Sequence, residues 1–155
     1  MDKLWCAGIL AVWMASSWAS ADSLRSVGIE TSDKTGCALS DGKTVIGSTI
    51  HLMVDAYGNH PKLKDETILE IITTAIMAGC NLHETNPSGL SPLNSAILLN
   101  QPVLVRLFLE SGANPNLRIS GSKAFMNGKN SFDLYERLKT RKDMAEIGTL
   151  LARLQ

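Results

Sequence analysis

The sequence has few of the residues from which catalytic and cofactor sites are built. Its 155 residues include three cysteines and three histidines, His51, His60 and His83. No histidine has a second ligand-type residue at the spacing of a zinc site, which needs three or four converging ligands. Neither a Gly-rich phosphate loop nor a Gly-x-Ser-x-Gly motif is present. We therefore expect a protein that is not an enzyme and that holds no cofactor and no metal.

An excess of charge of either sign is also lacking. Lys and Arg together number 15, as do Asp and Glu, so the formal net charge is zero. Nucleic acids and anionic membranes are bound by clustered basic surfaces. The balance of charge argues against both as partners.

One long apolar run is present, at the N-terminus. Lys3 supplies a positive charge, residues 4–18 are mostly apolar, and Ala19-Ser20-Ala21 has the small residues of a cleavage site. The run is shorter than the roughly 20 residues that span a membrane, which favours a cleaved signal peptide at 1–21 over an anchor. We expect residues 22–155 to be exported, to a periplasm rather than outside the cell, with no later membrane span.

The stretch from Asn86 to Arg118 predicts a pair of short helices. Ser91 can cap the first helix, and Pro92 suits the first helical position because its missing N–H would have no partner there. Pro102 starts a second helix that is apolar on nearly every side and ends at Gly112. So short a pair cannot bury this apolar surface alone, so similar units are expected on both sides.

These residues resemble an ankyrin repeat over 33 positions. The matching motifs are Gly89 in the loop, Ser91-Pro92-Leu93-Asn94 followed by Ala96, and the terminal run Phe108-Leu109-Glu110-Ser111-Gly112-Ala113-Asn114-Pro115-Asn116. The resemblance implies an all-α ankyrin-repeat solenoid of about three helix-pair repeats joined by hairpin-like finger loops. It also implies a binding scaffold, without naming a partner.

The rest of the chain can be divided in register with this stretch. Gly36-Cys37 and Ser48 both recur 43 residues later, as Gly79-Cys80 and Ser91. We expect helices to begin near Ser48, Asp65, Asn130 and Thr140, the last with Asp143 as part of a capping box. The expected parts are an N-terminal cap at 22–42 and repeats at about 43–85, 86–118 and 125–155, with an inserted loop at 57–64.

Two cysteines remain after signal cleavage, Cys37 and Cys80. An oxidising compartment would favour a disulfide between them. They occupy equivalent positions one repeat apart, however, and packed helices lie roughly 8 to 10 Å apart, whereas a disulfide needs Cα atoms within about 7 Å. We favour two buried thiols over the disulfide.

The resemblance to ankyrin repeats implies that a partner binds the finger loops and the far ends of the first helices. On this surface Leu90, Leu98 and Leu99 stand where the family usually has polar residues. Either they contact a partner, or the 57–64 loop or the long finger before residue 130 covers them. The expected partner-binding residues are Val45, Tyr57, Pro87, Ser88, Leu90, Leu98, Leu99, Met126, Lys129 and Arg137.

The resemblance also suggests a biological role. Small ankyrin proteins with signal peptides include bacterial immunity proteins, so we expect a chain that is monomeric when free and binds one protein partner, such as a toxin enzyme in the periplasm. Two alternatives are an accessory protein that stabilises a periplasmic enzyme, for example in peroxide defence, and a secreted effector directed at host proteins.

Overall fold

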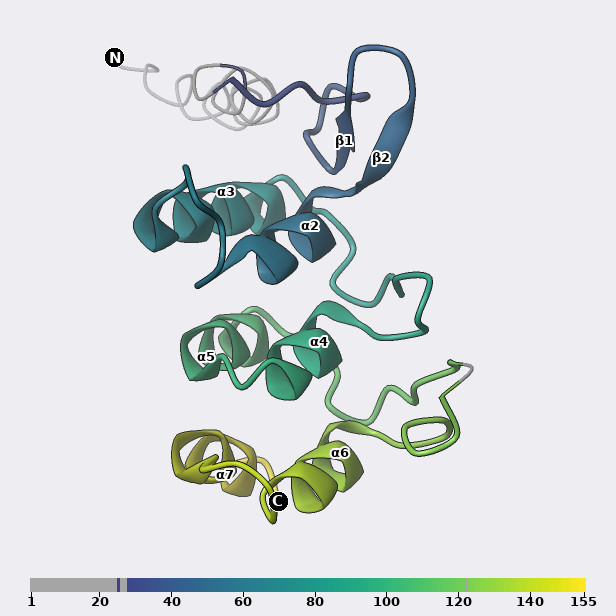
Figure 1. Ribbon diagram of the computed structural model, residues 1–155, viewed down its shortest axis with the longest axis vertical. Helices are drawn as coiled ribbons and strands as arrows, with labels where there is room; N and C mark the ends of the chain where they lie inside the picture. The colour runs from purple at the N-terminus through teal and green to yellow at the C-terminus, as the bar shows by residue number, and fades with distance from the viewer. Residues whose placement is uncertain (1–24, 26–27, 122) are drawn as a thin grey trace, which may run out of the picture.

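The computed structural model describes residue 25, residues 28–121 and residues 123–155. Helices follow each other in pairs, and the pairs lie in successive layers along the longest axis of the molecule (Figure 1). Within the described residues the pairs are α2 (Thr49–Ala56) with α3 (Asp65–Met77), α4 (Pro92–Leu98) with α5 (Pro102–Glu110), and α6 (Ser131–Leu138) with α7 (Ala145–Ala152).

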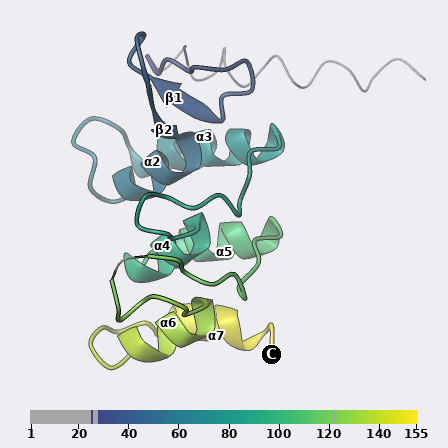
Figure 2. The ribbon, with the colours of Figure 1, turned by 90° about the vertical axis from the view of Figure 1, so that its right-hand side faces the viewer.

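The expected all-α solenoid class is wrong, because the chain also contains a sheet. Strands β1 (Ala38–Ser40) and β2 (Val45–Ser48) pair antiparallel, which makes the fold a mixture of α and β. Asp41 builds the turn between them, since its Oδ1 accepts hydrogen bonds from the backbone N–H groups of Lys43 and Thr44. This hairpin lies over the first helix pair (Figure 2), and its residue Leu39 is buried.

The core runs continuously through the three layers. Each helix contributes an apolar face, and the α4–α5 pair, with a neighbouring pair on each side, contributes the most fully covered residues. Completely buried side chains include Ile50, Ile72, Leu93, Phe108 and Ile147. The central pair is therefore the part of the chain that depends most on its neighbours.

Several local predictions are confirmed. Ser91 caps α4 by accepting a hydrogen bond from the N–H of Asn94 at 3.2 Å, and Pro92 is the first helical residue. Pro102 begins α5, and Gly112 has the left-handed conformation, with φ of 87°. Local capping chemistry therefore decides the ends of these two helices.

Two predicted helix starts need correction. Asp65 does not cap α3; it is the first residue of the helix, and its carboxylate accepts from the N–H of Gly58 across the inserted loop. The last helix begins at Ala145 and not near Thr140, so the capping box predicted with Asp143 is wrong. The Thr140 hydroxyl donates to the carbonyl of Arg137 at the end of the preceding helix.

The preference for two free thiols is wrong as well. Cys37 and Cys80 form a disulfide with a Cα–Cα distance of 5.3 Å. The spacing between helix axes does not apply to them, because Cys37 precedes β1 and Cys80 follows the end of α3. The bond joins the N-terminal hairpin to the first helix pair.

The predicted signal peptide at 1–21 lies outside the described residues. Within the part of the chain that the structure describes, no helix combines the length and the apolar character needed to cross a membrane.

Candidate functional site

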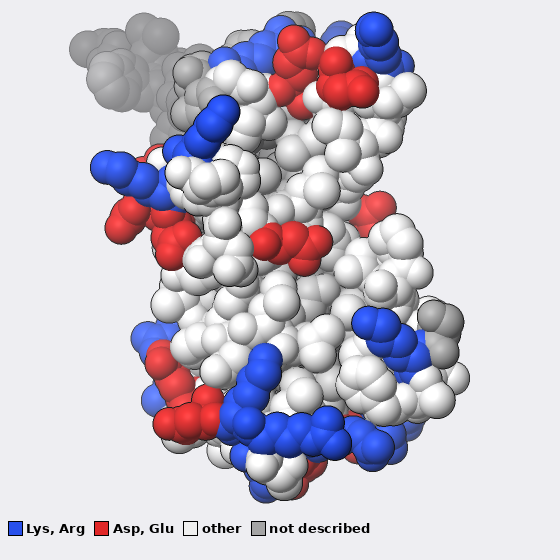
Figure 3. All heavy atoms as spheres, viewed as in Figure 1, with Lys and Arg blue, Asp and Glu red and all other residues white. Residues whose placement is uncertain are grey.

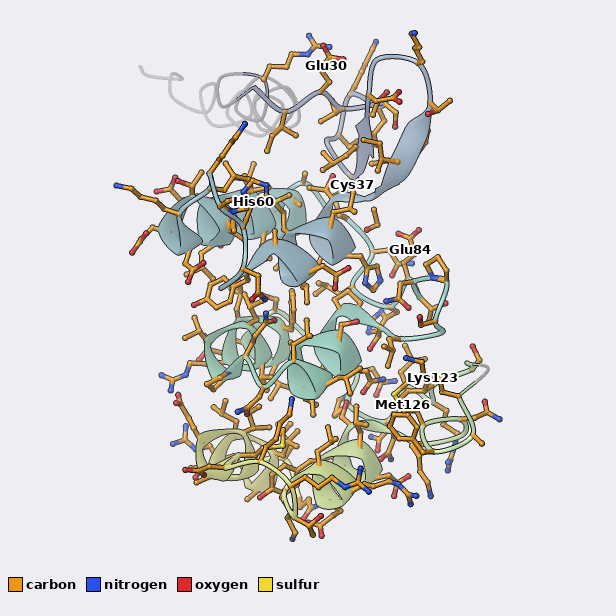
Figure 4. All side chains as sticks on the ribbon, viewed as in Figure 1. Glu30, Cys37, His60, Glu84, Lys123 and Met126 are labelled. Atoms are coloured by element: carbon orange, nitrogen blue, oxygen red, sulfur yellow. A yellow bond between two sulfur atoms is a disulfide. The ribbon has the colours of Figure 1, made fainter. Side chains whose placement is uncertain are left out.

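A hollow of about 200 Å³ lies where α2, α4 and the two long interhelical connections meet. These connections, which precede α4 and α6, project on the same side of the molecule (Figures 1 and 2). Figure 4 shows Lys123 and Met126 on the second of them, beside α4 and α6. The residues that line the hollow are Asp55, Asn86, Ser88, Leu90, Ser95, Leu98, Leu99, Lys123 and Met126.

Half of the predicted partner-binding residues meet at this hollow. They are Ser88, Leu90, Leu98, Leu99 and Met126. The structure therefore brings together residues from the connection that precedes α4, from the C-terminal end of α4 and from the connection that precedes α6.

The expected exposure of the leucines needs correction. Leu90 is only 4% exposed and Met126 only 1%, whereas Leu99 is 41% exposed and Leu98 lies between these extremes. The two connections touch directly, since the N–H of Ser120 donates to the carbonyl of Gly89 at 3.3 Å. Met126, from the connection that precedes α6, lines the same hollow as Leu90, and both side chains are buried.

The other five predicted residues do not line the hollow. Val45 is 63% exposed on β2, Pro87 and Arg137 are exposed, and Lys129 is half-buried. Tyr57 ends α2 and is also half-buried. These five residues therefore lie outside the hollow.

Tyr57 keeps its phenolic proton over a wide pH range. Burial of its hydroxyl raises its pKa above 10.0, and the negative charges of Asp65 and Glu66 raise it further. The side chain therefore remains neutral at the pH of any cellular compartment.

The ten expected residues leave out four polar residues of the lining: Asp55, Asn86, Ser95 and Lys123. Ser95 is on the same face of α4 as Leu98 and Leu99, because residues three and four apart on a helix are neighbours. This periodicity could have revealed it. Lys123 carried no such signal, since its position depends on how the long finger folds.

The histidines have structural contacts. His51 Nε2 lies 3.0 Å from the backbone carbonyl oxygen of Glu84, to which it donates. His60 Nδ1 accepts from the backbone N–H groups of Lys62 and Leu63, and His83 Nε2 accepts from the N–H of Asn114. Among the described residues no cluster of His, Cys, Asp or Glu could hold a metal ion.

Charge is distributed unevenly although its sum is zero. Residues 28–85 carry eight acidic and four basic side chains, whereas residues 86–155 carry five acidic and nine basic ones. Basic side chains gather at the α6–α7 end of the molecule (Figure 3). The hollow lies between the two regions, with Asp55 from the acidic part and Lys123 from the basic part.

Comparison with known proteins found no family model, no curated protein and no solved structure that matches the chain.

Proposed function

We propose that this chain is an exported protein–protein interaction module that binds one protein partner at the hollow. In its most specific form, the proposal is that the chain is an immunity protein that blocks a toxin enzyme in the periplasm. The observation that carries the proposal is that the exposed Leu99 lines the same hollow as the charged side chains of Asp55 and Lys123. Burial of a leucine against a partner contributes about 1.5 to 3 kcal/mol.

The charged groups at the hollow support the same proposal. The side chains of Asp55 and Lys123 make neither hydrogen bonds nor ion pairs within the described part of the chain. Such groups can add specificity and faster association when a partner presents complementary charges.

Two further observations support export and protein binding. The Cys37–Cys80 disulfide suits an oxidising compartment, in agreement with the signal-peptide pattern of residues 1–21. The resemblance of residues 86–118 to an ankyrin repeat supports a binding role, because that family consists of protein-binding scaffolds.

The test is affinity capture of a partner from periplasmic extract on immobilised chain, with three baits. The baits are the unmodified protein, Leu99→Asp at the hollow, and Val103→Asp as the matched control. Val103 is 45% exposed on α5, so its substitution adds the same charge at a similar exposure away from the hollow.

We expect one protein to be retained by the unmodified chain and by Val103→Asp, and lost with Leu99→Asp. Purified chain should then inhibit the activity of that protein at equimolar ratio. Retention that does not depend on Leu99 would contradict binding at the hollow, and a captured partner whose activity is unaffected would contradict the immunity role. Recovery of the chain in the cytoplasm would contradict export.

A further inference from the structure

One position of the first helix in each pair changes its charge from layer to layer. Asp55, Leu98 and Arg137 are each the seventh residue after the N-cap of their helices, which are α2, α4 and α6. The position is therefore acidic in the first layer, apolar in the second and basic in the third. Asp55 and Arg137 are both exposed.

These three residues form a row along the longest axis of the molecule. Helix α4 packs against α2 on one side and against α6 on the other (Figure 1). With helix axes roughly 8 to 10 Å apart, two layers separate Asp55 from Arg137 by about 16 to 20 Å, which is too far for an ion pair. Neither side chain has a hydrogen bond or an ion pair among the described residues. Both charges therefore remain available to another molecule.

An apolar row runs beside the charged one. The residue after each of the three is Ala56, Leu99 or Leu138. Leu99 is 41% exposed, and Ala56 and Leu138 are half-buried. A molecule that covers this face would bury apolar surface in all three layers, in addition to meeting the two charges.

The whole stack has the same order of charge as the row. Residues 28–85 carry a net charge of −4 and residues 86–155 a net charge of +4. Basic side chains gather at the α6–α7 end (Figure 3). A molecule that covers this face should therefore have the opposite order, basic beside α2 and acidic beside α6.

A second copy of the chain has this opposite order when it is turned round. A two-fold axis through the middle layer, perpendicular to the stack, places Asp55 of each copy opposite Arg137 of the other. The same rotation places the Leu99 side chains of the two copies next to each other at the axis. The order acidic, apolar, basic is thus complementary to itself.

We propose that two copies of this chain form a symmetric dimer through this face, with Asp55 of each copy paired with Arg137 of the other around a centre made by Leu99. The inference goes beyond the proposed function, because the second copy covers the hollow and a foreign partner would have to displace it. The free chain is then a dimer, whereas the sequence led us to expect a monomer.

The test measures the mass of the chain by sedimentation equilibrium over a series of concentrations. The variants are Asp55→Arg, Arg137→Asp and the double variant with both substitutions. Glu110→Arg and Arg153→Asp are the matched controls, since they make the same charge changes at exposed positions near the ends of α5 and α7. Thermal melts check that every variant folds.

We expect the mass of the unmodified chain and of both controls to rise toward twice that of one copy, and added salt to oppose the rise. Each single variant turns two attractive contacts into repulsive ones, which should raise the dissociation constant about tenfold or more. The double variant restores both contacts and should dimerise again. Mixing the two single variants should also give a dimer, because each supplies the charges that the other needs.

Four results would overturn the dimer. They are an unmodified chain that stays at the mass of one copy, a mass that continues beyond twofold, single variants that dimerise like the controls, and a mixture that does not recover association. Each of these would leave binding of a foreign protein at the hollow standing, because that proposal is tested by affinity capture and depends on Leu99.

Discussion

The side-chain amide of Gln101 donates to the backbone carbonyl of Tyr57 at 3.0 Å, across the boundary between the first and second helix pairs. The same Nε2 also donates to the carbonyl of Val54 at 3.2 Å. These carbonyls belong to the last turn and the C-cap of α2, where no further helical N–H groups follow to satisfy them. One side chain of the second helix pair therefore supplies hydrogen-bond donors to the C-terminal carbonyls of α2 in the first pair.

Replacing Gln101 with alanine should lower the free energy of unfolding by about 1 to 3 kcal/mol, because the Val54 carbonyl loses its side-chain donor and the Tyr57 carbonyl keeps only the longer bond from Asn59. Urea denaturation would measure the loss. Asn59→Ala is the matched control, since the Asn59 amide donates to the same Tyr57 carbonyl at 3.4 Å but is exposed. We expect the control to change stability by less than about 0.5 kcal/mol. Similar losses for both variants would contradict this role of Gln101.

Reducing the Cys37–Cys80 disulfide should destabilise the fold considerably. The bond closes a loop with a sequence separation of 43 residues, for which the chain-entropy model gives about 4 kcal/mol. Guanidinium unfolding with and without reductant would measure the difference. The double variant Cys37→Ala with Cys80→Ala should resemble the reduced protein and should not respond to reductant. A reduced protein as stable as the oxidised one would contradict the prediction.

His51 and Asn94 occupy the third position of successive helices, α2 and α4, but only Asn94 is fully paired by the next layer. Ser131, the first residue of α6, donates from Oγ to Asn94 Oδ1 at 2.8 Å. The corresponding residue of α4 is Pro92, which has no hydroxyl, and the buried His51 Nδ1 has no hydrogen-bond partner among the residues that the structure describes.

A serine at position 92 should supply the missing donor. Pro92→Ser and Pro92→Ala both lose the fixed backbone angle of proline, so the difference between them isolates the new hydrogen bond to His51 Nδ1. We expect the serine variant to be more stable than the alanine variant by about 1 kcal/mol in thermal or urea unfolding. Equal stability of the two variants would contradict the predicted hydrogen bond to His51 Nδ1.

A methyl group at Gly121 should force the two long connections apart. A Cβ there would collide with the carbonyl oxygen of Ser88. We expect Gly121→Ala to cost about 1 to 3 kcal/mol, the usual penalty of overpacking, and to expose Leu90 and Met126. Hydrogen exchange and urea unfolding would detect both effects.

Gly47→Ala is the control for this substitution. Neither glycine has a positive φ, and a Cβ at Gly47 would make an ordinary contact with Leu52 at 3.6 Å. The control should therefore stay within about 0.5 kcal/mol of the original protein. If Gly121→Ala were equally mild, the connections would not be in the close contact described above.

The sequence determined the features that depend on neighbours along the chain. The cap at Ser91, the helix starts at Pro92 and Pro102, and the left-handed Gly112 were all predictable, because capping and backbone preferences act over a few residues. The apolar face of α5 likewise showed that this helix must be covered on both sides. Most helix positions therefore followed from local patterns.

The tertiary structure alone decided which distant residues meet. It placed Cys37 against Cys80, brought the buried Leu90 and Met126 to one hollow, and left the buried Ser95 hydroxyl without a hydrogen-bond partner among the described residues. Each of these depends on the path of a hairpin or a long connection, whose residues have no periodic pattern to reveal their partners. The sequence thus predicted most of the helices and the exposure of Leu99. The packing of the two long connections determined which residues line the hollow.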